Sequence, residues 1–356
     1  MDIWVLDKDF NVLSPIVDQY DSLIWTDRYN SYGDFELCTF PDKTIFDLIQ
    51  KDRYLRINNS RHAMIVEDVE TITDSENGST IQFTGRSLES ILYRRIIWSH
   101  AVFSGTVKDV IKQILNENVI SPSDSSRKIP NFVFKDTTPS TMSNEKVEVQ
   151  FYGSYVYEAI ESICKSNDLG FEVILSDDNQ FVFSLYEGID RSYNQFENTY
   201  VVFSPQFDNL VDTNFVTSNK DYKNVVLVAG EGEGDDRKTT TVTENGKTYS
   251  GLDRREMFVD ARDISSTVVE GTISQEDYTK LLNQRGTEKL AEAIVYNCFE
   301  GEIDSTQTFV YGKDFFSGDI IQLVDEFGNE SRSRVTEVVI SQDETGFKTY
   351  PTIESI

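Results

Sequence analysis

The sequence predicts a mostly β protein of the α+β class, with two barrel-like β domains and two smaller α/β or helical decorations. Three observations carry this prediction. Short apolar runs that alternate with polar residues, separated by turn residues, fill the first 100 residues and return after about residue 200. Between them, two stretches repeat apolar residues at helical spacing. One longer helical stretch begins at Ser274.

The first barrel-like β domain is expected to occupy residues 1–100. Period-two alternation over residues 35–40 predicts a strand with one buried face. Pro41-Asp42 then opens a short helical turn, and Asn77-Gly78 favours a tight hairpin. The expected strands are residues 10–13, 23–26, 35–40, 54–57, 63–73 and 81–83.

Residues 101–200 are expected to form an α+β insert domain. Apolar residues in its two helical stretches fall three and four positions apart, so each helix would bury one face. The segment between the helices is rich in Thr, Ser and Glu and is too polar to join a core. The expected elements are a helix over 106–119, an exposed loop over 136–148, a helix over 154–168 that stops at Gly170, and a hairpin of 171–175 with 181–185.

The second barrel-like β domain is expected to combine residues 201–270 and 303–356. Residues 271–302 interrupt it as a helical decoration, in which Ser274 and Asp277 resemble a capping box with Asp in place of Glu. The expected strands are residues 201–203, 214–217, 224–229, 239–243, 247–249, 307–310, 320–324, 334–341 and 348–352, with Asn245-Gly246 as a hairpin turn.

Charge and hydropathy exclude several classes of protein. The 356 residues include 33 Lys and Arg against 61 Asp and Glu, a formal net charge of −28. Because phosphate contacts need clustered basic residues, this charge argues against unaided binding to nucleic acid or anionic membranes. The longest apolar run, Val225–Ala229, is far below the roughly 20 residues that cross a bilayer. The N-terminus shows no secretory signal.

Cysteine and histidine usage argues against metal and nucleophilic sites. Cys38, Cys164 and Cys298 are far apart and form no Cys-x-x-Cys motif, so we expect them to fill cores in a protein that folds in a reducing cytoplasm. His62 and His100 are the only histidines, and neither lies in a nucleophile or metal-helix motif. Both are expected at ordinary surface or strand-end positions.

Two further motifs are interpreted as turns. Gly230, Gly232 and Gly234 follow a predicted strand, as in a phosphate-binding loop, but the acidic residues between them would repel phosphate. Residues 74–78 resemble the start of a calcium loop, but Gly85 stands where such a loop carries Glu. We therefore predict no catalytic, cofactor-binding or metal-ligating residue and no cofactor.

Several segments, in a fixed order, match the pattern of one protein family. The first are Trp-Thr-Asp-Arg-Tyr at residues 25–29 and Gly-Asp-Phe-Glu-Leu at 33–37, followed by Gly-Arg-Ser-Leu-Glu-Ser-Ile-Leu at 85–92. The further segments are residues 94–96, 225–237, 254–256, 259–264, 314–315 and 318–321. Together they span nearly the whole chain. The set resembles the siphophage tail-hub family, the tail-associated or baseplate hub proteins, which is similar to the trimeric hub of contractile-tailed phages.

The resemblance implies a structural virion protein: a trimeric tail-tip or baseplate hub that closes or extends the tail tube. Two barrel-like β domains and two smaller domains per copy would form a ring around the tail channel. The implied partners are the distal tail protein ring, the tail tube and the tape-measure protein, and tip or fibre proteins, with DNA only as cargo. The implied location is the virion tail tip, after synthesis in the host cytoplasm, with no membrane anchor.

Physical arguments favour such a hub. Three copies with two similar β lobes each would present six surfaces, which matches a six-fold tail. A channel wall of negative or neutral charge would let DNA pass without binding its phosphates. Many relatives carry a C-terminal peptidase, lysozyme-like or carbohydrate-binding extension. Because this sequence ends at Ile356, soon after the last expected hub strand, we expect no such extension and no enzymatic activity.

Three alternatives stay open. A cell-wall-degrading tail enzyme would hold two carboxylates close together in a cleft. A carbohydrate- or receptor-binding tail module would expose a platform of Trp and Tyr, and burial of Trp4, Trp25 and Trp98 would argue against it. A hub from a related contractile injection system would share the fold of a phage hub, so the sequence does not separate these two.

Overall fold

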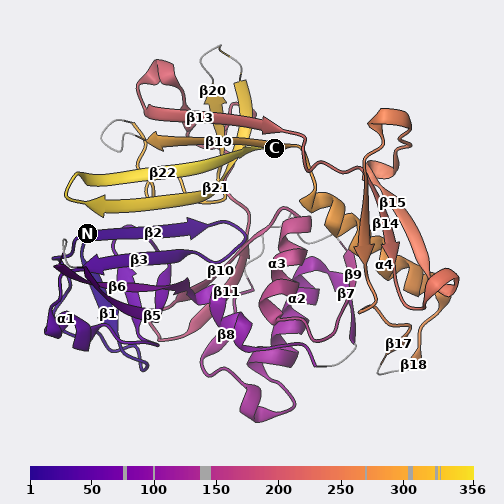
Figure 1. Ribbon diagram of the computed structural model, residues 1–356, viewed down its shortest axis with the longest axis horizontal. Coiled ribbons are helices and arrows are strands. Elements are labelled where there is room, and N and C mark those ends of the chain that lie inside the picture. Colours follow the sequence, from indigo (N-terminus) through magenta and orange to yellow (C-terminus); the bar gives the residue numbers. More distant parts are fainter. Residues whose placement is uncertain are drawn as a thin grey trace.

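The computed structural model shows one continuous sheet of twelve strands as the largest feature of the molecule (Figure 1). This sheet joins an N-terminal lobe to a C-terminal lobe. An α+β unit packs beside the sheet, and an outer unit lies at one end of the molecule. The described residues are 1–74, 78–98, 101–136, 146–268, 271–303, 308–324, 328 and 330–356.

The N-terminal lobe consists of antiparallel strands and one short helix. Its strands are β1 (Ile3–Leu6), β2 (Ser22–Arg28), β3 (Asp34–Thr39), β4 (Tyr54–Ile57), β5 (Ala63–Asp74) and β6 (Gly78–Ser87), in the order β1-β4-β5-β6-β3-β2. Side chains of β3 alternate between buried and half-buried, as the period-two pattern predicts. Helix α1 (Lys43–Leu48) begins after Asp42, whose carboxylate accepts hydrogen bonds from the Thr44 and Ile45 amides.

The C-terminal lobe pairs directly with the N-terminal lobe. Its strands are β12 (Val202–Phe203), β13 (Leu210–Ser218), β19 (Tyr296–Ile303), β20 (Ile320–Val324), β21 (Glu330–Asp343) and β22 (Gly346–Ser355). Strand β21 lies antiparallel to β2, with Leu23 opposite Gln342 and Arg28 opposite Glu337. The order then continues β21-β22-β19-β13, and β20 pairs with both β21 and β12.

The two lobes share one hydrophobic core across this join. Trp25 and Leu37 belong to the same buried cluster as Phe203, Val338 and Ile340 of the C-terminal lobe. The mostly β class predicted from the sequence is confirmed, but the described strands contain no closed barrel. The physical reason is that β2 and β21 pair with each other, so neither is left to close a barrel within its own lobe.

The α+β unit packs below the C-terminal lobe in the view of Figure 1. Strand β7 pairs with β9, and the second sheet has the order β10-β11-β8. The Thr106 side chain caps the first helix by accepting a hydrogen bond from the Asp109 amide. The elements are a 3-10 helix (Leu88–Arg94), β7 (Ala101–Thr106), α2 (Val107–Leu115), β8 (Phe132–Phe134), β9 (Lys146–Phe151), α3 (Val156–Ser166), β10 (Gly170–Leu175) and β11 (Phe181–Tyr186).

Two expectations for the α+β unit need correction. Helix α3 does not stop at Gly170, because Asp168 already takes the left-handed conformation with φ of 52° and Gly170 begins β10. The expected loop over 136–148 ends earlier, because β9 already starts at Lys146. Residues 137–145 lie outside the described residues.

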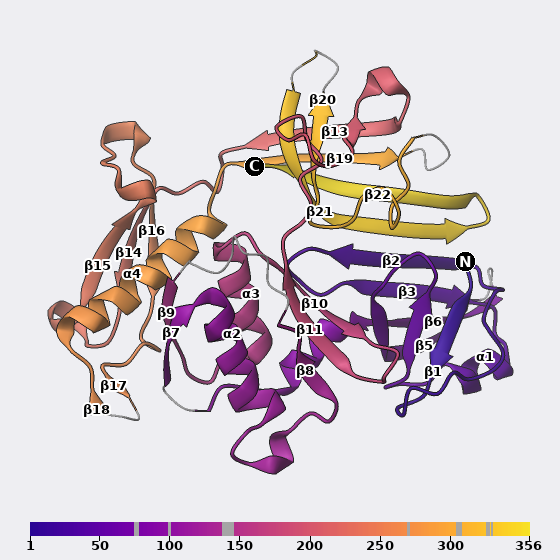
Figure 2. The same cartoon turned by 180° about the vertical axis from the view of Figure 1, so that it is seen from behind.

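The outer unit has its own sheet and its own core (Figure 2). Its elements are β14 (Val225–Ala229), β15 (Thr239–Thr243), β16 (Glu256–Asp260), β17 (Thr267–Val268), β18 (Gly271–Thr272) and α4 (Gln275–Glu292). The sheet order is β15-β14-β16, and α4 packs Tyr278 and Leu282 against Val226 and Val228. As predicted, Ser274 caps α4 by accepting a hydrogen bond from the Asp277 amide.

The outer unit divides the second β stretch differently from the sequence prediction. We expected residues 201–270 in one domain with residues 303–356, but β14 to β16 pair only with one another among the described strands. Strand β19 also begins within the expected helical decoration. No strand forms at residues 247–249, because Tyr249 donates a hydrogen bond to Glu244 at 2.7 Å and folds back beside the turn.

Two short predicted strands are also absent. Of residues 10–13, only Val12 forms a β-bridge, to Leu6. Residues 308–310 form no strand, and residue 307 lies outside the described part of the chain.

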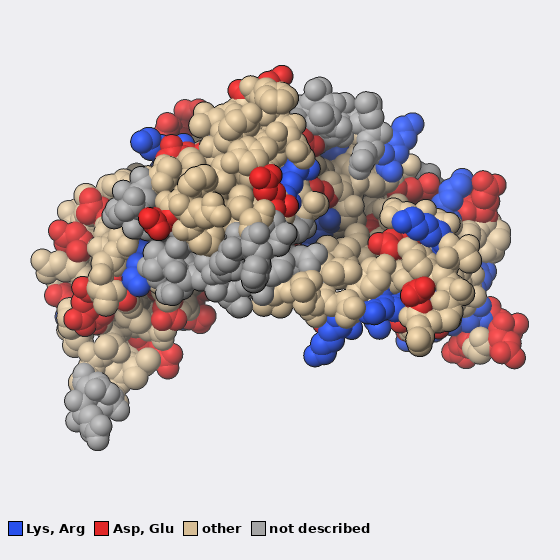
Figure 3. Space-filling view, turned by 90° about the horizontal axis from the view of Figure 1, so that it is seen from above, with Lys and Arg blue, Asp and Glu red and all other residues tan. Residues whose placement is uncertain are grey.

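Seen from above, the molecule is curved and leaves a hollow along one side (Figure 3). Acidic and basic side chains are interspersed on this face, and several basic side chains border the hollow. Across the described ranges, no helix is long and apolar enough to span a membrane.

Replacing Trp25 by Ala tests the shared core. Trp25 is fully buried, with Phe35 opposite it in β3 and Ile340 opposite it in β21. We expect the free energy of unfolding to fall by about 3–5 kcal/mol, because the substitution leaves a cavity. Phe40→Ala, at a position that is 65% exposed, is the control and should cost less than about 1 kcal/mol. Equal losses in urea denaturation would contradict this account of the core.

Candidate functional site at the interdomain junction

Tyr29, directly after β2, lies where the two lobes and the α+β unit meet. Its side chain is fully buried, and its hydroxyl donates to the Asp168 carbonyl oxygen at 3.0 Å. Tyr186 of β11 packs edge-on against it, with ring centroids 5.3 Å apart, and donates to the Tyr29 carbonyl. Burial raises the pKa of the Tyr29 phenol, so the group remains a neutral donor.

Two glycines make room for the Tyr29 ring. A Cβ atom on Gly170 would lie 2.4 Å from Tyr29 Cε2, and one on Gly318 would lie 2.5 Å from Tyr29 Cδ2. Gly318 also has a φ of +94°, which L side chains rarely adopt. Gly170 belongs to the α+β unit and Gly318 to the C-terminal lobe, so the ring is held between two units.

Arg334 of β21 covers the same ring. Its guanidinium carbon lies 4.7 Å from the Tyr29 ring centroid, and its side chain is only 7% exposed. Nη1 donates to the Gly318 carbonyl at 2.7 Å, and Nη2 pairs with Asp168 Oδ2 at 2.6 Å. A planar guanidinium can stack and donate at the same time, which an ammonium group cannot do. Arg334 therefore ties the C-terminal lobe to both other units.

A buried charge pair ties the N-terminal lobe to the α+β unit. His62 Nδ1 lies 3.4 Å from Glu89 Oε1, and the two side chains are 6% and 2% exposed. Glu89 Oε1 also accepts a hydrogen bond from the Val173 amide at 2.8 Å. Within the described part of the chain, His62 Nε2 and Glu89 Oε2 have no hydrogen-bond partner. Loss of either member would leave the other as an uncompensated buried charge.

The surroundings keep both members of this pair charged. Burial opposes the positive charge of His62, but Asp27 and Glu89 outweigh it and raise the His62 pKa to about 9. Burial also opposes the negative charge of Glu89, yet the hydrogen bond and charge of His62 hold its pKa below the usual value. Both groups are therefore ionised at neutral pH.

A cavity of about 470 Å³ opens beside the pair, between the two lobes. Asp27 in its wall accepts hydrogen bonds from Ser60 Oγ at 2.9 Å and from the Tyr311 hydroxyl at 2.8 Å. Arg61, also in the wall, pairs with Glu172 at 2.9 Å and lies over the Tyr186 ring. These charged groups link strands of different units, so the arrangement serves to hold the units together.

The histidines and the acidic turn considered from the sequence lie in different parts of the described structure or outside it. His62 lies directly before β5, at a strand end as expected, but it is buried rather than on the surface. His100 lies outside the described residues. Asp74 and Gly78 pair at the end of the β5–β6 hairpin, and residues 75–77 between them are not described. Among the described residues, no group of three or more His, Cys, Asp and Glu could hold a metal ion.

Cysteine positions agree with part of the prediction. Cys164 is fully buried in the α+β core, as expected, whereas Cys38 is only half-buried. Cys298 lies in β19, but its side chain is not described.

The tryptophans do not form one exposed platform. Trp25 is buried and Trp4 is half-buried against the core. Trp98 is 58% exposed and lies under the Arg127 guanidinium at 4.2 Å from the ring centroid. Burial of Trp25 removes one of the three residues that a carbohydrate-binding platform would use.

The similarity of this protein to known proteins extends over the whole chain rather than over one local motif. Residues 2–353 match the family described as Siphovirus ReqiPepy6 Gp37-like protein. The chain belongs to this family. The resemblance to a siphophage tail protein family stated from the sequence is thereby confirmed. No curated protein matches the chain.

Several solved tail proteins share the fold of this family member. The tail protein from Neisseria meningitidis MC58 is 13% identical, with a TM-score of 0.57 over 99% of this chain and 96% of that one. The 43 kDa tail protein of prophage MuSo2 from Shewanella oneidensis is also 13% identical, with a TM-score of 0.57 over 99% and 98%. Prophage tail protein gp18 from Listeria monocytogenes EGD-e is 15% identical, with a TM-score of 0.56 over 99% and 94%.

The segments that carry the family resemblance supply much of the junction. They contribute Asp27 and Tyr29 from residues 25–29, Glu89 from residues 85–92, and Gly318 from residues 318–321. Sequence reasoning missed the junction roles of His62, Gly170 and Arg334. The one available signal was the glycine at 170, and we interpreted it as a helix stop instead.

Gly318→Ala tests the space for the Tyr29 ring. We expect it to lower the free energy of unfolding by about 1–3 kcal/mol more than Gly328→Ala does, because only the first Cβ collides with packed atoms. Gly328 is a matched control, since its φ of +79° is similar and no atom lies within 4 Å of its Cβ position. Urea denaturation measures both. Equal costs would show that backbone strain alone, and not the Tyr29 contact, requires Gly318.

His62→Asn tests the buried pair through its pH dependence. The folded-state pKa of about 9 lies above the ordinary 6.5, so the stabilisation is complete below pH 6.5 and is lost as pH rises through 9. We expect the wild type to exceed the variant in stability by on the order of 1–3 kcal/mol at pH 6.5, and this difference to shrink toward pH 9 and above. Urea denaturation of both proteins at several pH values gives the difference in their free energies of unfolding, in which the contributions of the other titrating groups cancel. A constant difference would contradict the charged pair.

Proposed function

We propose that the protein is a hub of the tail tip or baseplate, a trimer that closes or extends the tail tube and lets DNA pass. The observation that carries the proposal is the pairing of β2 with β21, which sets two β lobes side by side in one sheet. Three such copies would present six lobes to a six-fold tail. Because the lobes share a core, both would hold fixed positions in the ring.

The family and its fold support a place in the virion tail. Tail proteins from Neisseria meningitidis, Shewanella oneidensis and Listeria monocytogenes share this fold over nearly their whole length. In the proposed hub, one face of the ring meets the distal tail protein, tail tube and tape-measure protein, and the other meets tip or fibre proteins. The role is structural rather than catalytic.

The net charge of −28 supports the passage of DNA through such a ring. Phosphate groups bind proteins through clusters of Lys and Arg, so a wall without such clusters releases DNA freely. The acidic excess also keeps separate copies soluble before assembly.

Mass measurement of the purified full chain tests the proposed ring. We expect a species of three times the 40.8 kDa chain mass in native mass spectrometry, formed alone or on co-expression with the distal tail protein. Electron cryomicroscopy of assembled tails should then show a three-fold ring at the tip. A strict monomer at high concentration, together with tails that show no such ring, would overturn the proposal.

A further inference from the structure

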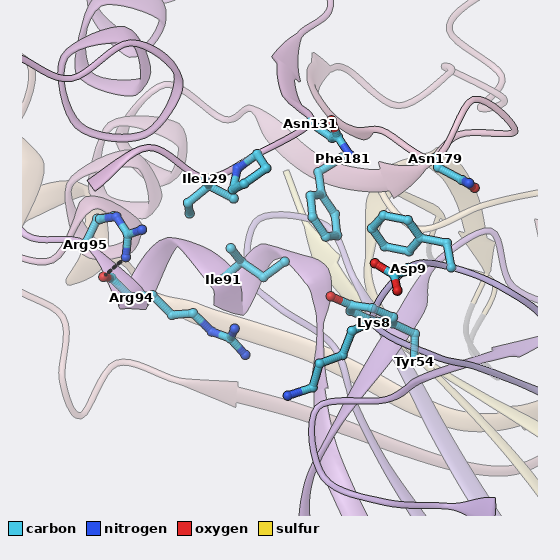
Figure 4. Close-up of a pocket in the computed structure, with 12 residues that line it drawn as sticks. Lys8, Asp9, Tyr54, Ile91, Arg94, Arg95, Ile129, Asn131, Asn179 and Phe181 are labelled. Atoms are coloured by element: carbon cyan, nitrogen blue, oxygen red, sulfur yellow. Dashed lines mark hydrogen bonds between the residues drawn. The ribbon is translucent and has the colours of Figure 1, made fainter. Parts of the chain in front are cut away.

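A second cavity, of about 570 Å³, lies between the N-terminal lobe and the α+β unit (Figure 4). Tyr54 of β4, Ile91 of the 3-10 helix and Phe181 of β11 line it. Lys8 and Arg94 extend their charged ends toward the same side of it. None of these lining residues belongs to the junction around Tyr29, so the cavity is a separate feature.

The cavity gathers positive charge on an otherwise acidic chain. Lys8, Arg94 and Arg95 line it against a single acid, Asp9. Lys8 and Arg94 share one further carboxylate, Asp52, at 3.1 and 3.5 Å, so three cations meet two acids at this cavity. Burial, followed by the charges of Arg127 and Arg94, lowers the Arg95 pKa. The excess of cations among the lining residues favours an anionic partner.

The walls of the cavity are aromatic and firmly held. Phe10 stacks on Tyr54 with ring centroids 5.3 Å apart and meets Phe181 edge-on at 5.2 Å. Phe10 adopts a φ of 66°, which is rare for a bulky residue and persists only where the surroundings enforce it. A preformed wall of this kind lowers the entropic cost of binding a partner segment.

The turn between β14 and β15 is an exposed acidic segment of the chain. Glu233, Asp235 and Asp236 lie there within four residues, all exposed. Glu231 is already held, because it accepts a hydrogen bond from the Ser266 amide at 2.8 Å. The turn belongs to the outer unit, on the other side of the α+β unit from the N-terminal lobe (Figure 1).

We propose that the cationic cavity receives the acidic turn, residues 233–236, of a second copy of this chain. The inference rests on the proposed ring, in which each copy meets the next through two different surfaces. Two copies with a charge of −28 each repel, so their contact needs a place where opposite charges meet. The cavity and the turn supply three cations and three carboxylates on opposite sides of one copy.

Charge reversal in the full chain tests this contact. We expect Lys8→Glu with Arg94→Glu to weaken self-association by about ten-fold or more at 0.15 M salt in sedimentation equilibrium, because two attractive pairs become repulsive. Both side chains are more than half exposed, at 69% and 52%, so the fold should be retained. The control is Lys43→Glu with Lys280→Glu, which changes the net charge equally at exposed ion pairs elsewhere and should retain association.

Reversing the charges of the turn tests the same contact without changing the cavity. Glu233→Lys with Asp235→Lys should weaken association to a similar extent. A chain that carries the reversals in both the cavity and the turn should associate within about three-fold of the wild-type affinity. The proposal is overturned if the cavity variant associates like its control, or if the double reversal restores nothing. A wild type that stays monomeric, together with assembled tails that show no three-fold ring, would instead overturn the hub itself.

Discussion

The contact on which the arrangement of the two lobes and the α+β unit depends is the Tyr29 ring between Gly170 and Gly318. The ring fits only because neither glycine carries a side chain, and Arg334 closes the space above it. Each of these three partners lies in a unit other than the N-terminal lobe that supplies Tyr29. Close-packed interiors transmit displacement rather than absorb it, so this contact constrains the relative orientation of the two lobes and the α+β unit.

Besides this local contact, the pairing of β2 with β21 joins the two lobes in one continuous sheet. A sheet that runs through both lobes, with one shared core, resists bending between them. In the proposed hub, the functional feature would then be the fixed placement of surfaces rather than a reactive centre. This agrees with the segments that carry the family resemblance, since they contribute connecting residues such as Asp27, Glu89 and Asp319.

Charged residues play different roles inside the molecule and on its surface. Several of the 33 basic residues are engaged in contacts within or between units: Arg86 with Glu67, Arg191 with Asp319, and Arg334 with Asp168. Cations held in this way cannot attract phosphate, and the excess of acids remains on the surface. A cavity at which Lys8, Arg94 and Arg95 outnumber the acids Asp9 and Asp52 therefore differs in charge from the chain as a whole.

The sequence by itself determined the features that depend on near neighbours: the alternation of β3, the Asp42 and Ser274 helix caps, and the buried face of α2. Tertiary structure alone decided that β2 lies beside β21, that β14 to β16 form a separate sheet, and that His62 is buried against Glu89. The reason is physical. An apolar pattern states which face of a strand is buried, but the strand beside it, and the partner of a buried charge, come from residues distant in the chain.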